Sequence, residues 1–257
     1  MPAIEITYRG QKGEIHIQEL NPGATDTIVL VHGMFGNLSQ FYLTIAPFLA
    51  REFRVLMYDL RSHGRSTCFK TGFDLNTLSE DLNRVIIESG AEKCHLLGFS
   101  YGALIVLKYA MRFGEKVNKV IALEIPPRHT LPFKDKGTYT FDDFWAFALS
   151  LPPHVRDNFL RSKRQVKNTY NLYENIFNNT SFVEDMNNEK EFSSSDYTLV
   201  QAPVQLFFGD HSICLPELER VKNWINKKTI SFEQGDHGFF MHRCEQSANK
   251  MIEFLQR

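Results

Sequence analysis

The sequence predicts an α/β protein with a mostly parallel sheet, helices on both faces and an inserted helical cap. Short apolar runs rich in branched residues alternate with segments of helical periodicity. The runs are apolar throughout rather than at every second residue, and such strands need cover on both faces. The alternation stops at residue 126 and resumes with the apolar run at residues 204–209, which indicates an insertion.

The elements are expected in a regular order along the chain. A hairpin is predicted first, because two alternating segments flank the turn-forming residues RGQKG. The apolar strands are expected at residues 27–33, 54–60, 93–99, 119–125, 204–209 and 229–234. Helices are expected at residues 38–53, 77–90 and 101–114 and at the C-terminus. Thr77 and Glu80 have the spacing of a capping box, which would start the second of these helices.

Residues 126–200 differ in composition and in residue pattern from the rest of the chain. The stretch is too long for a plain loop, and it contains polar, asparagine-rich segments of helical character. We predict that it forms a helical cap, inserted into a core made of residues 1–125 and 201–257.

Composition and charge argue against several classes of partner. The chain has 257 residues, 43% of them hydrophobic, which suffices for one sizeable core. Its 29 basic and 30 acidic residues are well mixed, so no field of one sign attracts nucleic acid or anionic lipid. No apolar run approaches the roughly 18–20 residues that span a bilayer. The first residues lack a signal-peptide pattern, and the four cysteines lack metal-ligand spacing, so we expect a reduced, cytoplasmic protein without a metal.

The strongest indication of chemistry is the pentapeptide GFSYG at residues 98–102, between an expected strand and an apolar helix. A serine in a sharp strand-to-helix turn adopts a strained backbone, and small residues two positions away on either side avoid a clash. The turn holds the Ser100 hydroxyl clear of the sheet at the positive end of the helix. In this context Ser100 is predicted to be a nucleophile rather than part of a chance loop.

A second turn, HGMFG at residues 32–36, follows an earlier strand. Such a turn leaves a backbone N–H facing the nucleophile. The N–H groups of Met34 and Tyr101 are therefore expected to form an oxyanion hole. His32 is expected to make a structural hydrogen bond, and the motif DLRSHGRS at residues 59–66 is also interpreted as structural.

The segment GDHGFF at residues 235–240 supplies a candidate general base. A base must reach the nucleophile with Nε2 and be oriented through Nδ1. His237 is expected on a loop at the carboxyl edge of the sheet, as is Ser100, and open α/β sheets bind ligands at that edge. We therefore predict that His237 is the base.

The motifs HGMFG, DLRSHGRS, GFSYG and GDHGFF, in this order and spacing, resemble the α/β-hydrolase fold family. The resemblance covers nearly the whole chain, although the cap matches only in position. It implies a triad of serine, histidine and a carboxylate that acts through an acyl-enzyme. No cofactor or metal is implied.

The resemblance leaves two candidates for the carboxylate. In many family members the acid follows the strand after the cap, but counting from Gly209 to Pro216 places Ser212 at that position. Asp210 lies two residues too early. One subset of the family, which includes small acyl esterases and related lipid hydrolases, carries its acid after the preceding strand, where this chain has Glu124. Glu124 is therefore the preferred acid and Asp210 the alternative, although the usual residue there is aspartate.

Aromatic residues near the motifs indicate an apolar substrate pocket. The pocket is predicted to include Phe35, Phe99, Trp145 and Phe239. Trp145 belongs to a stripe at helical spacing in the cap, together with Phe141, Phe144 and Ala148. This stripe either lines the pocket or docks the cap on the core.

These features predict a serine hydrolase that cleaves a carboxylic ester or thioester with a hydrophobic acyl group. The acyl group could be carried by a small molecule, an acyl-carrier protein or coenzyme A. Acyl transfer, carbon–carbon bond hydrolysis and cofactor-free lyase chemistry use the same triad and stay open. A receptor that keeps the fold but turns over little is the alternative from another class.

Overall fold

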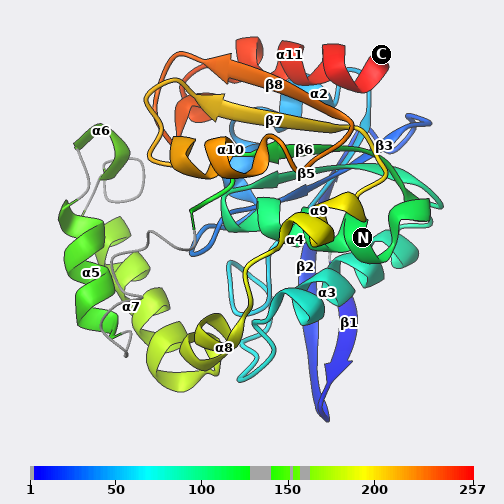
Figure 1. The fold of residues 1–257 in the computed structure, drawn as a ribbon. Coiled ribbons are helices and arrows are strands. Elements are labelled where there is room, and N and C mark those ends of the chain that lie inside the picture. The colour runs from blue at the N-terminus through cyan, green and yellow to red at the C-terminus, as the bar shows by residue number, and fades with distance from the viewer. Residues whose placement is uncertain (1–2, 128–139, 151–152, 157–162) are drawn as a thin grey trace.

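The computed structural model describes residues 3–127, 140–150, 153–156 and 163–257, which form an eight-stranded sheet flanked by helices (Figure 1). The strands are β1 (Ala3–Tyr8), β2 (Gln11–Leu20), β3 (Thr27–Val31), β4 (Arg54–Tyr58), β5 (Cys94–Phe99), β6 (Val117–Leu123), β7 (Val204–Gly209) and β8 (Lys228–Glu233). Their order in the sheet is β1-β2-β4-β3-β5-β6-β7-β8. Only the pairings β1–β2 and β2–β4 are antiparallel among the described strands. The predicted mostly parallel sheet is confirmed.

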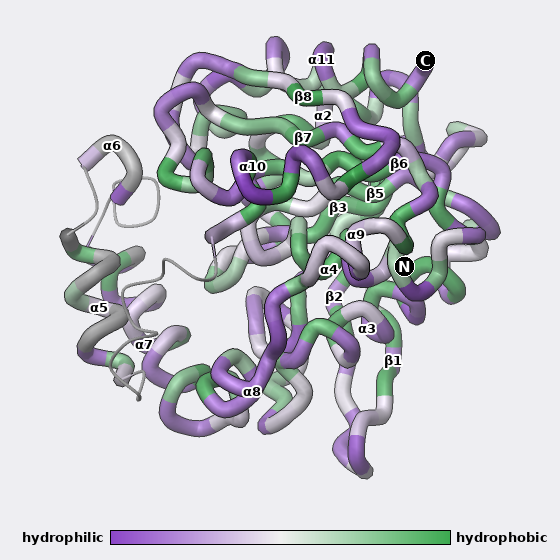
Figure 2. The backbone as a smooth tube through the Cα atoms, in the orientation of Figure 1, coloured by the Kyte–Doolittle hydropathy of each residue, from purple (hydrophilic) through white to green (hydrophobic). Residues whose placement is uncertain are grey.

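Helices cover both faces of this sheet. The helices of the core are α1 (Ser39–Tyr42), α2 (Ala46–Leu49), α3 (Leu75–Glu88), α4 (Tyr101–Arg112), α10 (Leu215–Val221) and α11 (Cys244–Gln256), with 3-10 turns at η1 (Gly114–Lys116) and η4 (Phe239–Met241). Apolar residues of α3 and α4 share one core cluster, and those of α2 and α11 share the cluster on the opposite face (Figure 1). Every residue of β3, β5 and β7 is buried, and Figure 2 shows hydrophobic residues concentrated in the middle of the sheet.

The predicted helix over residues 38–53 is wrong as a single element. The segment forms α1 and α2, with a turn between them. Pro47 lies in the first turn of α2. Proline has no N–H and its ring clashes with the preceding helical turn, so a helix that ran through this position would be broken or kinked there.

The start of α3 also differs from the prediction. The helix begins at Leu75, and Asp74 is its N-cap. The carboxylate of Asp74 accepts the backbone N–H of Thr77 over 3.0 Å. The expected capping box that starts at Thr77 is therefore wrong, because Asp74 caps the helix three residues earlier and Thr77 already lies within its first turn.

Five further helices are described between β6 and β7. They are α5 (Phe141–Ser150), α6 (Pro153–Arg156), α7 (Lys163–Asn179), α8 (Phe182–Asn188) and α9 (Ser194–Thr198). In Figure 1, α5 to α8 lie on the side of the sheet toward which the arrows of β7 and β8 point. Phe192 and Tyr197 instead join the main core cluster. The boundaries of the cap stay a prediction, and the side chains of Phe144 and Ala148 lie outside the described residues. None of the described helices is long and apolar enough to cross a membrane.

Candidate active site

Ser100 lies at the tip of a tight turn between β5 and α4. Its backbone has φ 52° and ψ −119°, a conformation that residues with a side chain rarely adopt. The Ser100 N–H donates to the carbonyl of Leu123 over 2.9 Å. A Cβ added to Gly98 would lie 2.2 Å from the oxygen of Gly102, and one added to Gly102 would lie 2.1 Å from the oxygen of Val31. Glycine is therefore required on both sides of the serine, as the sequence predicted.

The turn at residues 32–36 lies against this serine. A Cβ added to Gly33 would be 3.3 Å from Cβ of Ser100. The N–H of Gly33 donates to the side chain of Gln40, and the N–H of Phe35 donates to Nε2 of His63 over 3.1 Å. Among the described residues, no acceptor is bonded to the N–H of Met34. Met34 therefore keeps a backbone donor for a ligand beside Ser100, while Tyr101 starts α4 at the same place.

His32 has a structural role, as expected. Its Nδ1 lies 2.7 Å from the carbonyl of Gly33, and its Nε2 accepts the N–H of Leu60 over 2.9 Å. An N–H can only donate, so the proton of this ring is on Nδ1. Burial lowers the pKa of His32, which keeps the ring neutral. In the neighbouring motif, Arg61 makes two hydrogen bonds to Asp81 at 2.7 and 2.8 Å, which also indicates a structural role.

His237 and Glu124 meet at the same edge of the sheet. Nδ1 of His237 lies 3.0 Å from Oε2 of Glu124, and the Glu124 side chain is completely buried. The other carboxylate oxygen accepts the N–H of Gly209 over 2.5 Å. The imidazole packs against the ring of Phe99, with 4.9 Å between ring centroids, directly before Ser100 in the chain. The structure thus gathers the serine turn, the histidine and the carboxylate.

The pKa of His237 is set by opposing effects. Burial alone would lower it, but interactions with Cys214 and with Glu124 raise the pKa well above its ordinary value. We assign the larger part of this increase in the pKa of His237 to Glu124. Burial raises the pKa of the Cys214 thiol, and an uncharged thiol gives little electrostatic support to an imidazolium ion.

Ser212 and Cys214, which follow β7 in the chain, complete the surroundings of the His237–Glu124 pair. The Ser212 hydroxyl donates to Oε2 of Glu124 and accepts the N–H of Cys214 over 3.0 Å. Sγ of Cys214 lies 3.2 Å from Nδ1 of His237. Ser212 therefore supports the carboxylate from the position where many family members carry their acid. Sequence reasoning missed Cys214, because a single cysteine without metal-ligand spacing carries no signal.

Asp210 is placed differently from Glu124. Its Oδ1 accepts the N–H of Gly235 over 2.9 Å, and its side chain is 44% exposed. Asp210 thus braces the loop that carries His237, and the hydrogen bond from His237 to a carboxylate goes to Glu124. The neighbouring His211 is exposed.

The four predicted pocket residues fall into two groups. Phe35 and Trp145 border an aromatic cluster, which is defined by the buried residues Phe73, Phe141, Tyr173, Ile176, Phe177 and Phe182. The ring of Phe35 lies 4.1 Å from that of Tyr173, between centroids. Phe99 and Phe239 are buried in the core cluster on the α11 face. The aromatic cluster therefore connects the turn of Met34 to the helices α5, α7 and α8. Phe99 and Phe239 instead pack beside the site within the core on the α11 face.

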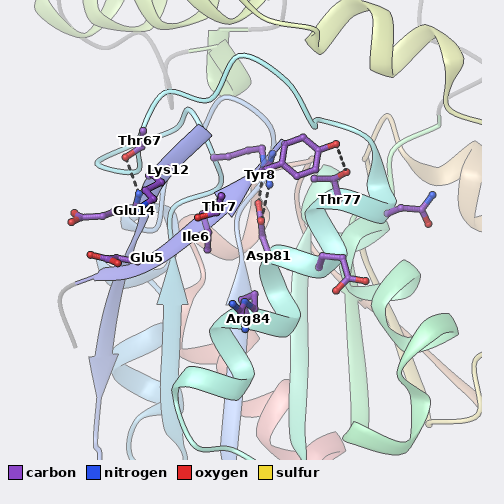
Figure 3. Close-up of a pocket in the computed structure, with 14 residues that line it drawn as sticks. Glu5, Ile6, Thr7, Tyr8, Lys12, Glu14, Thr67, Thr77, Asp81 and Arg84 are labelled. Carbon is purple, nitrogen blue, oxygen red and sulfur yellow. Dashed lines mark hydrogen bonds and ion pairs between the residues drawn. The ribbon is translucent and has the colours of Figure 1, made fainter. Parts of the chain in front are cut away.

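A separate polar cavity of about 840 Å³ lies between the β1–β2 hairpin and α3 (Figure 3). Tyr8, Lys12, Thr77 and Arg84 are among the residues that line it, and Ser100, His237 and Glu124 are not. The buried Arg61 guanidinium at this cavity is already bonded to Asp81. The cavity shares no lining residue with the serine site.

Comparison with known proteins decides the family. The model of the alpha/beta hydrolase fold family matches residues 26–243. The chain belongs to this family. Ethanol acetyltransferase 1 from Cyberlindnera jadinii is 30% identical over 112 residues, which cover 43% of this chain and 33% of that protein. The AB hydrolase superfamily protein YisY from Bacillus subtilis is 34% identical over 97 residues, 37% of this chain and 36% of that protein. The chain thus matches only about a third of the length of these relatives.

Solved structures of the same fold match along almost the whole chain. The enol-lactonase from Burkholderia xenovorans has a TM-score of 0.78 at 18% identity, covering 99% of this chain and 100% of that one. The thioesterase domain from the curacin biosynthetic pathway has a TM-score of 0.69 at 18% identity, covering 97% and 98%. At this identity the likeness concerns the fold alone.

Proposed function

We propose that this protein is a serine hydrolase that cleaves a carboxylic ester or thioester with a hydrophobic acyl group. The observation that carries the proposal is the 3.0 Å contact between His237 and the buried Glu124 at the edge where the strained Ser100 turn lies. A strained serine between two glycines, together with a histidine oriented by a carboxylate, is the arrangement of an activated nucleophile.

In the proposed reaction, the Ser100 hydroxyl attacks the acyl carbonyl while Nε2 of His237 accepts its proton. Glu124 holds the Nδ1–H and stabilises the imidazolium that forms. His237 then gives the proton to the leaving alcohol or thiol, and a water molecule releases the acyl-enzyme by the same steps. The N–H groups of Met34 and Tyr101 would stabilise the oxyanion, and one such donor is worth roughly 10²–10³ in kcat.

The preference for a hydrophobic acyl group rests on the aromatic cluster. Phe35 follows Met34 in the oxyanion turn, and its ring packs against those of Tyr173 and Phe182 at 4.1 and 5.5 Å. Met34 itself packs against the same cluster. A substrate whose carbonyl lies at Met34 therefore has its acyl group directed toward apolar side chains, and their burial against it would supply binding energy.

Fluorophosphonate labelling tests the proposal directly. We expect covalent labelling of the wild type, complete loss in Ser100→Ala, and strong loss in His237→Ala. Asp210→Asn is the matched control and should still be labelled. A panel of p-nitrophenyl esters and coenzyme A thioesters of increasing acyl length should then show kcat/KM rising with chain length. Labelling that does not depend on Ser100 and His237 would contradict the proposal.

Acyl transfer to an alcohol is a second candidate, because two relatives bear the name ethanol acetyltransferase. In that reaction an alcohol replaces water in the second half of the cycle. Adding ethanol to an ester assay distinguishes the two. Hydrolysis predicts mainly free acid, whereas acyl transfer predicts that ethyl ester becomes the main product at ethanol concentrations far below that of water.

A further inference from the structure

Three potential metal ligands converge around Nδ1 of His237. Oε2 of Glu124 lies 3.0 Å from this nitrogen and Sγ of Cys214 lies 3.2 Å from it. The ligand atoms of the three residues all lie within 4.8 Å of one another. Glu124 and Cys214 are buried and His237 is half-buried. The end of β6, the start of α10 and the loop after β8 thus supply a carboxylate, a thiol and an imidazole to one point.

We propose that this cluster binds a thiophilic divalent cation such as Zn²⁺ or Cd²⁺, and that the bound cation inhibits the protein. Thiolate, imidazole and carboxylate are the ligands that Zn²⁺ takes in proteins. With Zn–S about 2.3 Å and Zn–N and Zn–O about 2.0–2.2 Å, tetrahedral angles place the ligand atoms roughly 3.3–3.6 Å apart. The distances from His237 to Glu124 and Cys214 therefore need to grow by only roughly 0.3 Å.

The charges and protons of the cluster also suit a dication. The thiol of Cys214 loses its proton to solvent when the cation binds, because the thiolate is the ligand. Together with the Glu124 carboxylate, this thiolate balances the two positive charges. The neutral form of the site releases one proton for each cation bound, and a protonated His237 releases a second from its ring; no atom is oxidised or reduced.

The groups around the cluster would hold its ligands in place. The N–H of Gly209 bonds Oε1 of Glu124, and the Ser212 hydroxyl bonds Oε2. Ser212 also accepts the N–H of Cys214. Such outer hydrogen bonds orient metal ligands and raise affinity. The same serine therefore holds the Glu124 carboxylate and the backbone of Cys214.

Inhibition follows from the tautomer of His237. When the imidazole of this hydrogen-bonded pair is neutral, Nδ1 carries the proton and Nε2 is free to accept one. A cation on Nδ1 forces the proton of the neutral ring onto Nε2, which can then only donate. The base would be lost even though every catalytic side chain is intact. This inhibitory consequence rests on the proposed function, whereas the binding does not.

Titration of the full-length protein with Cd²⁺ tests the proposal with two readouts. The first is the charge-transfer absorbance of a Cd²⁺–thiolate bond, and the second is ester hydrolysis. We expect one Cd²⁺ per chain, loss of hydrolysis as the absorbance grows, and recovery of activity with EDTA. In Cys214→Ser the absorbance should vanish, and half-inhibition, relative to the variant's own rate, should need at least tenfold more Cd²⁺. Cys68→Ser removes an exposed thiol and is the matched control.

Further variants keep the outcome decisive. Cys214→Ala is a second test of the thiol, and thermal unfolding shows whether each variant folds. His237→Ala keeps the thiol and should bind Cd²⁺ at least tenfold more weakly. Ser100→Ala should lack hydrolysis yet keep the absorbance, so binding is measured even if the proposed function fails. Absorbance that persists in both Cys214 variants, or half-inhibition unchanged by them, would overturn the proposed site.

Discussion

Oε2 of Glu124 is shared by His237 Nδ1, at 3.0 Å, and the Ser212 hydroxyl. Glu124 directly follows β6, and its backbone has a φ of 58°. Its N–H still donates to the carbonyl of Phe207 in β7 over 2.9 Å. The positive φ turns the residue out of the strand direction, and the longer glutamate side chain reaches the histidine from there.

Replacement of this carboxylate should abolish most activity. We expect Glu124→Gln to lower kcat for ester hydrolysis by roughly 10³–10⁴-fold, because the amide can hold neither the correct tautomer nor the imidazolium. Asp210→Asn should change kcat by less than about fivefold, since Asp210 accepts a backbone N–H of the histidine loop and lies near the exposed His211 rather than bonding His237. Steady-state kinetics of both variants tests this prediction. A larger loss of kcat in Asp210→Asn than in Glu124→Gln would assign the acid to Asp210.

Ser212 should matter for stability and for rate. Ser212→Ala removes a donor to Glu124 and leaves the buried N–H of Cys214 without its acceptor. A buried donor left unsatisfied costs about 1–3 kcal/mol, which urea unfolding can measure. We also expect kcat to fall by roughly tenfold, because one hydrogen bond that holds the carboxylate is lost. Ser212→Thr, which keeps the hydroxyl, should lose less activity; equal losses would show that the hydroxyl is not what matters.

The serine turn depends on the absence of a side chain at Gly102. A Cβ there would lie 2.1 Å from the oxygen of Val31, so β3 or α4 must shift. We expect Gly102→Ala to reduce the free energy of unfolding by at least about 1–3 kcal/mol and to abolish fluorophosphonate labelling. At Gly114 a Cβ would meet nothing within 4 Å, so Gly114→Ala is the control and should unfold like the wild type. A stable, labelled Gly102→Ala would refute this account of the turn.

His63 should make the protein sensitive to acid. Burial and the neighbouring His32 lower the pKa of His63 from 6.5 to about 3. Between these values the unfolded chain binds the proton and the folded protein does not, so the free energy of unfolding falls as the pH is lowered from 6.5 toward 3. In His63→Gln this contribution is absent. Its unfolding free energy should therefore depend on pH less steeply, by up to about 1.4 kcal/mol per pH unit; parallel curves for the two proteins would contradict the prediction.

The sequence alone determined the order of strands and helices along the chain and the positions of the site motifs. Short continuous apolar runs rich in branched residues are typical of strands covered on both faces, and the GFSYG turn carries its own steric reason for glycine at both ends. Ser100, His237 and the turn of Met34 follow from such local patterns. Local patterns failed at residues 38–53 and at Thr77, where Pro47 and Asp74 changed the helix boundaries.

The tertiary structure decided which side chains meet. Glu124 was preferred over Asp210 only through a family resemblance, whereas the structure bonds Glu124 to His237 directly. The approach of Cys214 to the same nitrogen has no sequence signal, and the aromatic stripe of the cap did not reveal which rings of the other helices it would meet. These contacts join residues of separate loops and helices, and their distances depend on how the strand ends are stacked in the sheet. Spacing along the chain records the order of residues within one element, but not the distance between two elements that pack side by side.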